Sequence, residues 1–175
     1  MELIKFADFA KNIQDGCENA LKENGILYLT TRNQVRIVAT DPTTICVTRC
    51  SPMKSGVEKG TPEQLYSSKQ SVRFFQWCKT NNLEYGILSD KYGLFMFDER
   101  REAYDLHPSE LTDEGLRRLG LKIRFTMAKR ERRVLLFYNP SPVMATPYFK
   151  MLLFSGLDTY YTSKLFAIGQ KGFLP

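Results

Sequence analysis

Histidine and cysteine are scarce in this chain of 175 residues, which has one histidine and four cysteines. Any Ser-His-Asp or Cys-His catalytic arrangement would have to use His107, and its position just before Pro108 is more typical of a surface histidine at the approach to a helix. The cysteines are too few and too scattered for a disulfide scaffold, so we expect reduced thiols. Cys46 and Cys50 lie four residues apart, but no second Cys or His pair stands at zinc-finger spacing. We therefore expect neither a metal site nor a cofactor.

Long hydrophobic runs are also missing. No stretch approaches the roughly 18 uncharged apolar residues that would suggest a membrane span. Residues 1–8 contain neither a basic leader nor a long apolar run before a small-residue cleavage site. The sequence therefore predicts a cytoplasmic protein with no membrane partner. Hydrophobic residues make up 43% of the chain and charged residues 25%, as in an ordinary globular domain with a sizeable core.

The first 43 residues combine a helical pattern with two strand-like runs. Over residues 3–23, apolar side chains recur every three or four positions, which predicts an amphipathic helix that ends near Gly25. Residues 25–30 and 34–39 are rich in β-branched and other apolar residues, so they predict a hairpin. Asp41 and Pro42 then break the pattern. We expect an N-terminal helix and β-hairpin appendage over residues 1–43, followed by an α/β domain over residues 44–175.

After residue 43, short apolar runs alternate with helical patterns. Such alternation indicates crossover units in which a mainly parallel sheet is covered by helices on both faces. The predicted fold class is therefore α/β, a three-layer sandwich. The expected strands cover residues 44–49, 85–88, 134–138 and 165–169. Two helices are expected to begin after Thr61 and after Thr112, and a third helix is expected over residues 147–154.

The loop after the predicted strand at 44–49 has the composition of an anion site. It contains two glycines, two serines and two lysines just before a helix start. Free backbone amides and the helix dipole attract negative charge there, and lysine adds a counter-charge. The loop is also typical of a flexible polar connection. The candidate ligand-binding residues in it are Ser51, Lys54, Ser55 and Thr61.

Cys50 stands at the beginning of the same loop. A thiol just after a strand, near Lys54 and a helix start, can be an activated catalytic nucleophile. A buried and unreactive cysteine is the alternative. The sequence leaves both interpretations open.

Polar residues follow two further predicted strands. Ser89, Lys91 and Tyr92 are candidates to bind a base or sugar by hydrogen bonding and stacking. Asp90, and Asp105 further along, are candidates for a general base or a charge stabiliser. Because parallel strands end at one edge of a sheet, we expect these loops to form one site. Tyr138 and Asn139, after the strand at 134–138, complete the candidate set.

The net charge of +6 is concentrated in one segment. Residues 117–133 hold eight basic side chains against Glu131 as the single acidic one. A concentrated basic stripe is typical of proteins that bind RNA, DNA or nucleotide phosphates, although a solvated helix face gives the same pattern. The candidate nucleic-acid-binding residues are Arg117, Arg118, Lys122, Arg124, Lys129, Arg130, Arg132 and Arg133.

Several short motifs stand in a distinctive order along residues 44–140. They are Cys50-Ser51-x-x-Lys54, Leu65-Tyr66-Ser67-Ser68, Ile87-Leu88-Ser89-x-Lys91-Tyr92-Gly93-Leu94, Tyr104-Asp105 and Phe137-Tyr138. This order resembles a domain-of-unknown-function family of bacteria and archaea. The Cys-Ser-x-x-Lys element is also similar to one in a domain of archaeal archaeosine synthases, whose fold is like that of uracil-DNA glycosylases. Asp90 stands where the family has a small residue, and residues 1–43 have no counterpart. The resemblance implies an α/β fold and a site rather than a reaction.

These features together predict an α/β domain that associates with nucleic acid or a nucleotide and acts on a nucleobase or a glycosidic bond. Lys54 and the amides near Thr61 would hold a phosphate, residues 89–92 would face the base or sugar, and the basic stripe would hold the backbone. A non-catalytic nucleic-acid-binding module and a protein-interaction module are the alternatives. The sequence leaves open the ligand, the choice between RNA and DNA, and the oligomeric state.

Overall fold

A six-stranded sheet forms the centre of the protein. The computed structural model describes residues 25–107, 110–141 and 145–169. The strand order is β1-β8-β7-β2-β4-β5, and every neighbouring pair is parallel except β4 and β5. The predicted α/β fold with a mainly parallel sheet is confirmed. The strands are β1 (Ile26–Tyr28), β2 (Thr44–Arg49), β4 (Tyr85–Ser89), β5 (Gly93–Met96), β7 (Val134–Tyr138) and β8 (Asp158–Thr162).

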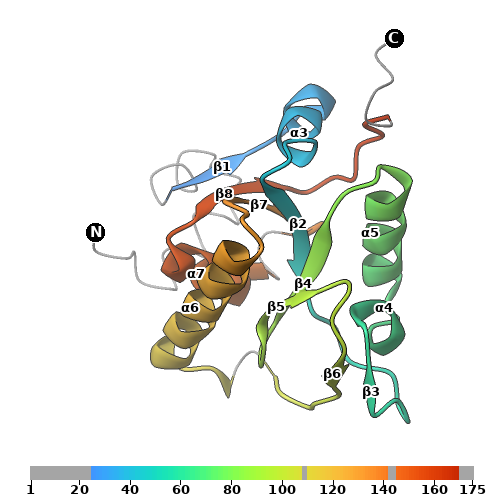
Figure 1. The fold of residues 1–175 in the computed structure, drawn as a ribbon, viewed down its shortest axis with the longest axis vertical. Coiled ribbons are helices and arrows are strands. Elements are labelled where there is room, and N and C mark those ends of the chain that lie inside the picture. The colour runs from blue at the N-terminus through green and yellow to red at the C-terminus, as the bar shows by residue number, and fades with distance from the viewer. Residues whose placement is uncertain (1–24, 108–109, 142–144, 170–175) are drawn as a thin grey trace.

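Helices cover both faces of this sheet (Figure 1). The short helix α4 and the longer helix α5 lie on one face of the sheet, and α6 and α7 lie together on the other face. A two-stranded antiparallel ribbon, β3 (Lys59–Gly60) with β6 (Arg101–Glu102), stands outside the main sheet. The helices are α3 (Arg32–Ala39), α4 (Pro62–Leu65), α5 (Lys69–Thr80), α6 (Asp113–Lys129) and α7 (Thr146–Ser155).

The central strands are buried along nearly their whole length because helices cover both of their faces. Ile45 and Val47 of β2, Ile87 of β4 and Leu135 of β7 have no exposed surface. Helix α6 begins where the sequence places a capping hydroxyl. The Thr112 side chain accepts a hydrogen bond from the Gly115 amide at 3.1 Å and so caps α6 as expected.

The prediction of a β-hairpin is wrong, because residues 32–39 form helix α3. The Thr31 hydroxyl accepts from the Gln34 amide at 3.2 Å, and the Gln34 side chain accepts from the Thr31 amide at 3.1 Å. This reciprocal capping starts a helix even though its sequence is rich in β-branched residues. The first strand, β1, instead pairs in parallel with β8 at the edge of the main sheet. The amphipathic helix expected over residues 3–23 lies outside the described residues.

Two further expectations about elements need correction. The expected helix after Thr61 is divided into α4 and α5, because Tyr66 has extended backbone and Ser68 caps a new helix through the Ser71 amide at 3.1 Å. The expected strand at 165–169 has no regular structure. Its Phe166 carbonyl accepts a hydrogen bond from the Trp77 indole at 2.7 Å, so this segment packs over α5 instead of joining the sheet.

Within the described parts of the chain, none of the helices has both the length and the apolar character needed to cross a membrane.

Candidate functional site

The candidate site lies at the edge of the sheet where the parallel strands end. Cys50 follows β2, Ser89 ends β4 and Tyr138 ends β7, and the register of these strands places all three at the same edge, as expected. The chain leaves β2 toward β4 on one side but leaves β7 toward β8 on the other. The loops therefore diverge between β2 and β7. In open α/β sheets, such a divergence is the preferred place for a ligand.

A cleft with a volume of about 680 Å³ opens at this edge. Three parts of the chain build it: Arg49 of β2 with the loop that follows, Asp90 with the segment after β6, and Tyr148 of α7. The lining residues are Arg49, Cys50, Ser51, Pro52, Met53, Lys54, Gly56, Val57, Asp90, Ala103, Tyr104, Asp105, Leu106, His107 and Tyr148.

A buried cluster of three polar side chains lies in the wall of the cleft. The Cys50 thiol donates a hydrogen bond to Oδ2 of Asp90 at 3.3 Å, and Cys50 Sγ lies 3.2 Å from the Tyr148 hydroxyl. Asp90 is only 4% exposed. Its second oxygen, Oδ1, is buried without a hydrogen-bond partner among the described residues. The cluster therefore fixes one oxygen of the carboxyl group and leaves the other available.

Burial dominates the titration of this cluster. Loss of hydration raises the pKa of Asp90, although hydrogen bonds from Cys50 and Tyr148 and the charges of His107 and Arg49 act in the opposite direction. Burial and the neighbouring Asp90 raise the pKa of Cys50 to about 12. At neutral pH, Cys50 is therefore a thiol that donates to Asp90 and not a thiolate. This state does not support its candidacy as a nucleophile.

Arg49 is a cleft residue that sequence reasoning missed. Its Nε donates to Oδ1 of Asn139 at 3.0 Å, and the Gln70 side chain donates to the same oxygen at 2.8 Å. Asn139 is buried and does not line the cleft, so it orients Arg49 instead of facing a ligand. The available signal in the sequence was a single charged residue at the end of a strand that is otherwise uncharged.

Tyr148 was missed because it belongs to an apolar helical run. The sequence around it predicts a buried helix, and Tyr148 is indeed 1% exposed. Its hydroxyl nevertheless reaches the Cys50 thiol. Only the packing of α7 against the end of β2 brings these groups together, and nothing in the sequence spacing indicates that contact.

Ser89 and Tyr104 form a second polar network beside the cleft. The two hydroxyls lie 2.7 Å apart, and the Tyr104 hydroxyl lies 3.3 Å from that of Tyr66. The Ser89 hydroxyl also accepts from the amides of Lys91 and Tyr92, at 3.2 and 3.0 Å. Ser89 is fully buried and holds the turn after β4. Ser89 does not line the cleft, whereas its hydrogen-bond partner Tyr104 does.

The structure brings only part of the predicted site together. Of the expected ligand-binding or catalytic residues, five line the cleft: Cys50, Ser51, Lys54, Asp90 and Asp105. The remaining ones, Ser55, Thr61, Ser89, Lys91, Tyr92, Tyr138 and Asn139, lie outside its lining. Thr61 precedes a helix of four residues, and its amide donates to Gln64 at 2.9 Å. Tyr138 stacks on Phe74 in the core, with ring centroids 6.1 Å apart.

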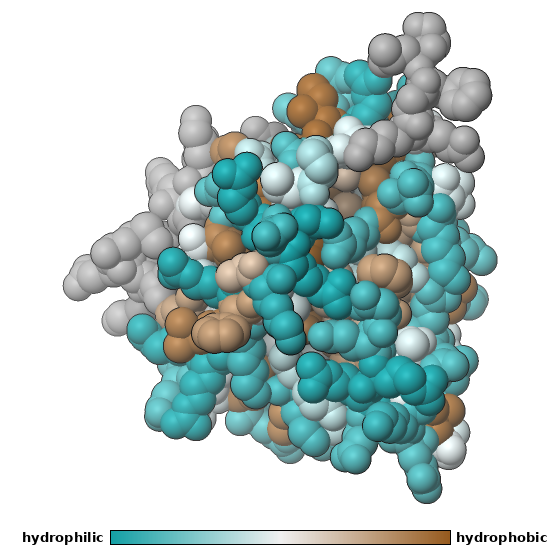
Figure 2. All heavy atoms as spheres, viewed as in Figure 1, coloured by the Kyte–Doolittle hydropathy of each residue, from teal (hydrophilic) through white to brown (hydrophobic). Residues whose placement is uncertain are grey.

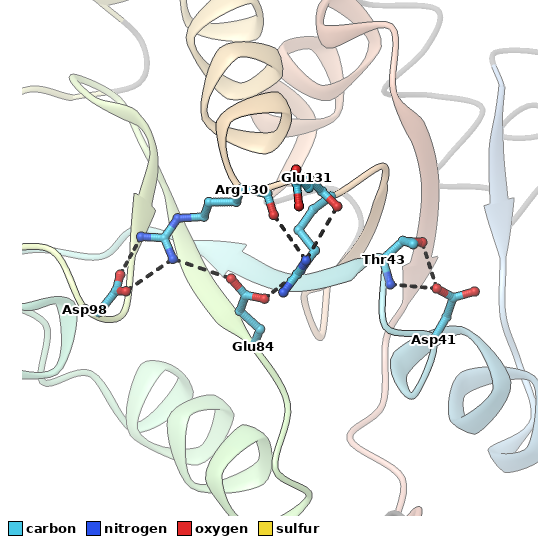
Figure 3. A network of polar contacts seen from close by, with 7 residues as sticks. Asp41, Thr43, Glu84, Asp98, Arg130 and Glu131 are labelled. Carbon is cyan, nitrogen blue, oxygen red and sulfur yellow. Dashed lines mark hydrogen bonds and ion pairs between the residues drawn. The ribbon is translucent and has the colours of Figure 1, made fainter.

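The eight basic residues of segment 117–133 do not form one surface. Arg130 lies 2.5 Å from Asp98 and 3.4 Å from Glu84, and Arg132 lies 2.8 Å from Glu84 (Figure 3). This network lies at the N-terminal ends of β4 and β7, whereas the cleft lies at the C-terminal ends of the same strands. Two of the predicted nucleic-acid contacts are thus ion-paired far from the candidate site.

The other basic residues belong to α6 and its C-terminal turn. Arg118 forms an exposed ion pair with Glu114, and the Arg117 guanidinium lies 4.6 Å from the centre of the Phe154 ring. Lys122 Nζ donates to the Lys91 carbonyl at 3.3 Å, which places it beside the turn after β4. Arg124, Lys129 and Arg133 are also exposed.

Across the described residues, no three His, Cys, Asp or Glu side chains gather in a way that could hold a metal ion. Comparisons of the chain with protein-family models, with curated proteins and with solved structures find no match. The resemblance to a domain-of-unknown-function family therefore stays a prediction.

Proposed function

We propose that the cleft binds the base of a nucleotide, either free or as a unit of nucleic acid, through Asp90. The observation that carries this proposal is the Oδ1 atom of Asp90, which is buried in the cleft wall and has no hydrogen-bond partner in the described part of the chain. An unsatisfied buried polar group costs about 1–3 kcal/mol, so a hydrogen-bonding ligand would recover that free energy. Cys50 donates to the other oxygen of the carboxyl group, and Tyr148 contacts the Cys50 sulfur, so the direction of the carboxyl group is fixed.

The remaining cleft residues suit the other parts of a nucleotide. Arg49, Lys54 and His107 place positive charge or hydrogen-bond donors on the cleft wall, which favours a phosphate. Tyr104 offers an aromatic wall for a base, and Asp105 offers an acceptor for a sugar hydroxyl. A volume of about 680 Å³ is ordinary for a small-molecule site, for which about 300–1,000 Å³ is typical.

The proposed chemistry is base modification or glycosidic-bond chemistry in which Asp90 acts as a general base or stabilises developing charge. Its raised pKa moves the carboxyl group toward the working range of a proton-transferring residue. A non-catalytic binding module is the second candidate. It is favoured by the pKa of about 12 for Cys50, because a thiol in that state gives the site no activated nucleophile.

Isothermal titration with a panel of nucleobases, nucleosides and nucleotides tests the proposal. We expect Asp90→Asn to weaken binding of every ligand that binds the parent protein, and Lys54→Ala to weaken only those that carry a phosphate. Lys69→Ala removes an equally exposed charge outside the cleft and serves as the control. The proposal fails if the parent protein binds none of the panel at millimolar concentration, or if Asp90→Asn binds as the parent does.

Folding has to be checked in the same variants. Lys54 is exposed, and its side chain forms no hydrogen bond or ion pair with any of the described residues. Lys54→Ala should therefore change the free energy of unfolding by under about 1 kcal/mol. A variant that unfolds would show that the loop after β2 is structural. In that case Lys54→Gln, which keeps the length of the side chain, separates loss of charge from loss of packing.

A further inference from the structure

A cluster of cations stands beside the cleft, on the turn that follows β4 and on the ribbon strand β6. Lys91 Nζ lies 5.4 Å from the centre of the Tyr92 ring and 5.9 Å from that of Tyr104. The Arg101 guanidinium carbon lies 5.2 Å from the centre of the Tyr92 ring. Tyr92 therefore holds two cations at once. Distances near 5 Å are favourable for attraction between a cation and an aromatic face.

Tyr104 connects this cluster with the cleft. Its ring lines the cleft and meets the Tyr92 ring edge to face, with centroids 5.5 Å apart. A ligand that fills the cleft and extends past Tyr104 therefore reaches Lys91 and Arg101 next. The cations therefore lie next to the part of the cleft that Tyr104 lines.

The backbone around these cations is held in place. The Ser89 hydroxyl accepts from the amides of Lys91 and Tyr92, and Lys122 Nζ donates to the Lys91 carbonyl. The Tyr92 hydroxyl donates to the Glu102 carbonyl at 2.8 Å, which ties the turn after β4 to the ribbon. The cluster is thus ordered by contacts from three elements. The backbone from which these long side chains extend is therefore fixed, which lowers part of the conformational entropy that is lost when they bind an anion.

The charge of this surface is positive after its acidic neighbours are counted. Lys91, Arg101 and Lys122 are all exposed. Glu99 lies 3.8 Å from Arg101, a weak ion pair between partly exposed groups, and Glu102 is exposed on β6. Lys59 and Arg100 add two exposed cations to this surface, and Glu58 and Asp105 add two exposed carboxylates, so the surface keeps one positive charge in excess.

From this arrangement we propose that the natural partner is single-stranded nucleic acid, with one base in the cleft and the adjoining phosphates on Lys91, Arg101 and Lys122. The proposal rests on the function proposed above. Basic side chains beside an aromatic wall are the usual means of following a single strand without reading its sequence. A base inside a duplex is paired and stacked, so it cannot reach a carboxyl group that is 96% buried without leaving the helix.

Fluorescence anisotropy with a labelled 12-nucleotide oligothymidylate and the matching oligouridylate tests this proposal. The double variant Lys91→Gln/Arg101→Gln removes two charges beside the cleft. Lys129→Gln/Arg133→Gln removes two exposed charges near the opposite edge of the sheet and is the matched control. We expect at least a tenfold loss of affinity in the first and less than a twofold loss in the second. The slope of log affinity against log salt should fall by about 1.4 in the first only, at about 0.7 for each lost single-strand phosphate contact.

Two outcomes would overturn the proposal. One is an equal effect of both double variants, which would show attraction by net charge alone. The other is a hairpin duplex that binds as tightly as the single strand. Tyr92→Phe, which keeps the ring, should retain oligonucleotide affinity within twofold, whereas Tyr92→Leu should lose it while thermal unfolding shows that the protein stays folded.

Mononucleotide binding separates failure of this proposal from failure of the proposed function. Lys91→Gln/Arg101→Gln should leave mononucleotide affinity within twofold, because neither residue lines the cleft. If mononucleotides bind and oligonucleotides bind no better, only the single-strand proposal fails. If no mononucleotide binds but the two double variants still differ with the oligonucleotide, the proposed function of the cleft fails and the cation cluster keeps its role.

Discussion

Asp90 is buried in the cleft wall, and its burial affects the stability of the protein. Because burial raises its pKa, the folded protein binds the Asp90 proton more tightly than the unfolded chain does. The stability that this proton contributes is present below the unfolded-state pKa, near 3.9, and is lost as the pH rises through the folded-state pKa. At neutral pH the buried carboxylate is therefore a cost to the fold.

The first prediction concerns the amide variant Asp90→Asn, which stays uncharged at every pH. Relative to the parent, we expect it to gain stability at pH 7 and to lose this advantage as the pH falls toward 4. Urea denaturation at several pH values measures the difference. Asp105→Asn, at an exposed position of the same cleft, is the control and should follow the parent. Parallel profiles for Asp90→Asn and the parent would contradict the raised pKa.

Cys50 gives the second prediction. A thiol that is 6% exposed and has a pKa of about 12 should react slowly with iodoacetamide at pH 7.5, since the thiolate is the reactive form. We expect labelling of Cys50 to be at least a hundredfold slower in the folded protein than in urea. Mass spectrometry of Cys17→Ser protein measures it without interference from Cys17. Rapid labelling of the folded protein would restore Cys50 as a candidate nucleophile.

Residues that follow a strand directly could be predicted as site residues, while those that reach the site by packing could not. Cys50 and Asp90 come just after β2 and β4, and a parallel sheet brings such positions to one edge. Arg49 closes a strand, and its direction depends on the register of β2. Tyr148 depends on how α7 packs, which its apolar neighbours do not reveal. A sequence pattern shows where a chain turns, but it does not show which long side chain reaches across.

At the scale of elements, Gly120 determines how closely α6 approaches α7. A Cβ atom at Gly120 would lie 2.8 Å from the backbone and Cβ of Phe154 and 2.9 Å from the Ser155 amide nitrogen. Only glycine allows this approach. Glycine has a cost at this position, since its helix propensity is about 1 kcal/mol less favourable than that of alanine in a helix interior.

The third prediction compares two glycines of α6. Gly120→Ala should destabilise the protein by about 1–3 kcal/mol, because overpacking outweighs the gain in helix propensity. Gly115→Ala should be neutral or stabilising by up to about 1 kcal/mol, because its Cβ would meet nothing closer than the Thr112 hydroxyl at 3.4 Å. Urea denaturation measures both. Equal effects of the two substitutions would show that the helix contact yields easily.

The elements near the N-terminus show which local signals outweigh others. Residues 34–39 have the β-branched content of a strand, yet the sequence Thr31-Arg32-Asn33-Gln34 is a capping box and starts α3. This signal was present in the sequence and favours a helix. The pairing of β1 with β8 was not available in the same way, because it joins segments more than a hundred residues apart. Local chemistry can start a helix, whereas sheet partners depend on the whole chain.

At the scale of the whole molecule, polar and apolar surfaces are unevenly distributed. Most of the face shown in Figure 2 is hydrophilic, with brown and tan atoms over parts of α6 and α3. The exposed apolar side chains include Phe125 at 80% and Leu121 at 60%, one turn apart on α6. Scattered exposed apolar residues are normal in soluble proteins, and this pair by itself indicates no partner.

The positive charge is also divided between the two edges of the sheet. Near the cleft, Lys54, Lys91 and Arg101 extend into solvent. At the far edge, Arg130 joins Glu84 and Asp98, and its side chain is only 23% exposed. Arg130 and Glu84 are therefore partly desolvated, and each of them has two oppositely charged neighbours in the network. The two groups of basic residues should consequently have different roles.

The last prediction separates these roles with single variants. Arg130→Gln leaves Asp98 without its cation and leaves Glu84 with Arg132 alone, so it should destabilise the protein by about 1–2 kcal/mol, between the values for an exposed and a fully buried ion pair. It should leave the salt dependence of oligonucleotide binding unchanged, because this network lies across the sheet from the cleft. Arg133→Gln, an exposed neighbour, should change stability by no more than about 0.5 kcal/mol. Urea denaturation and anisotropy titrations at several salt concentrations measure the two properties. A smaller salt slope for Arg130→Gln in protein that remains folded would instead assign the far edge to nucleic-acid binding.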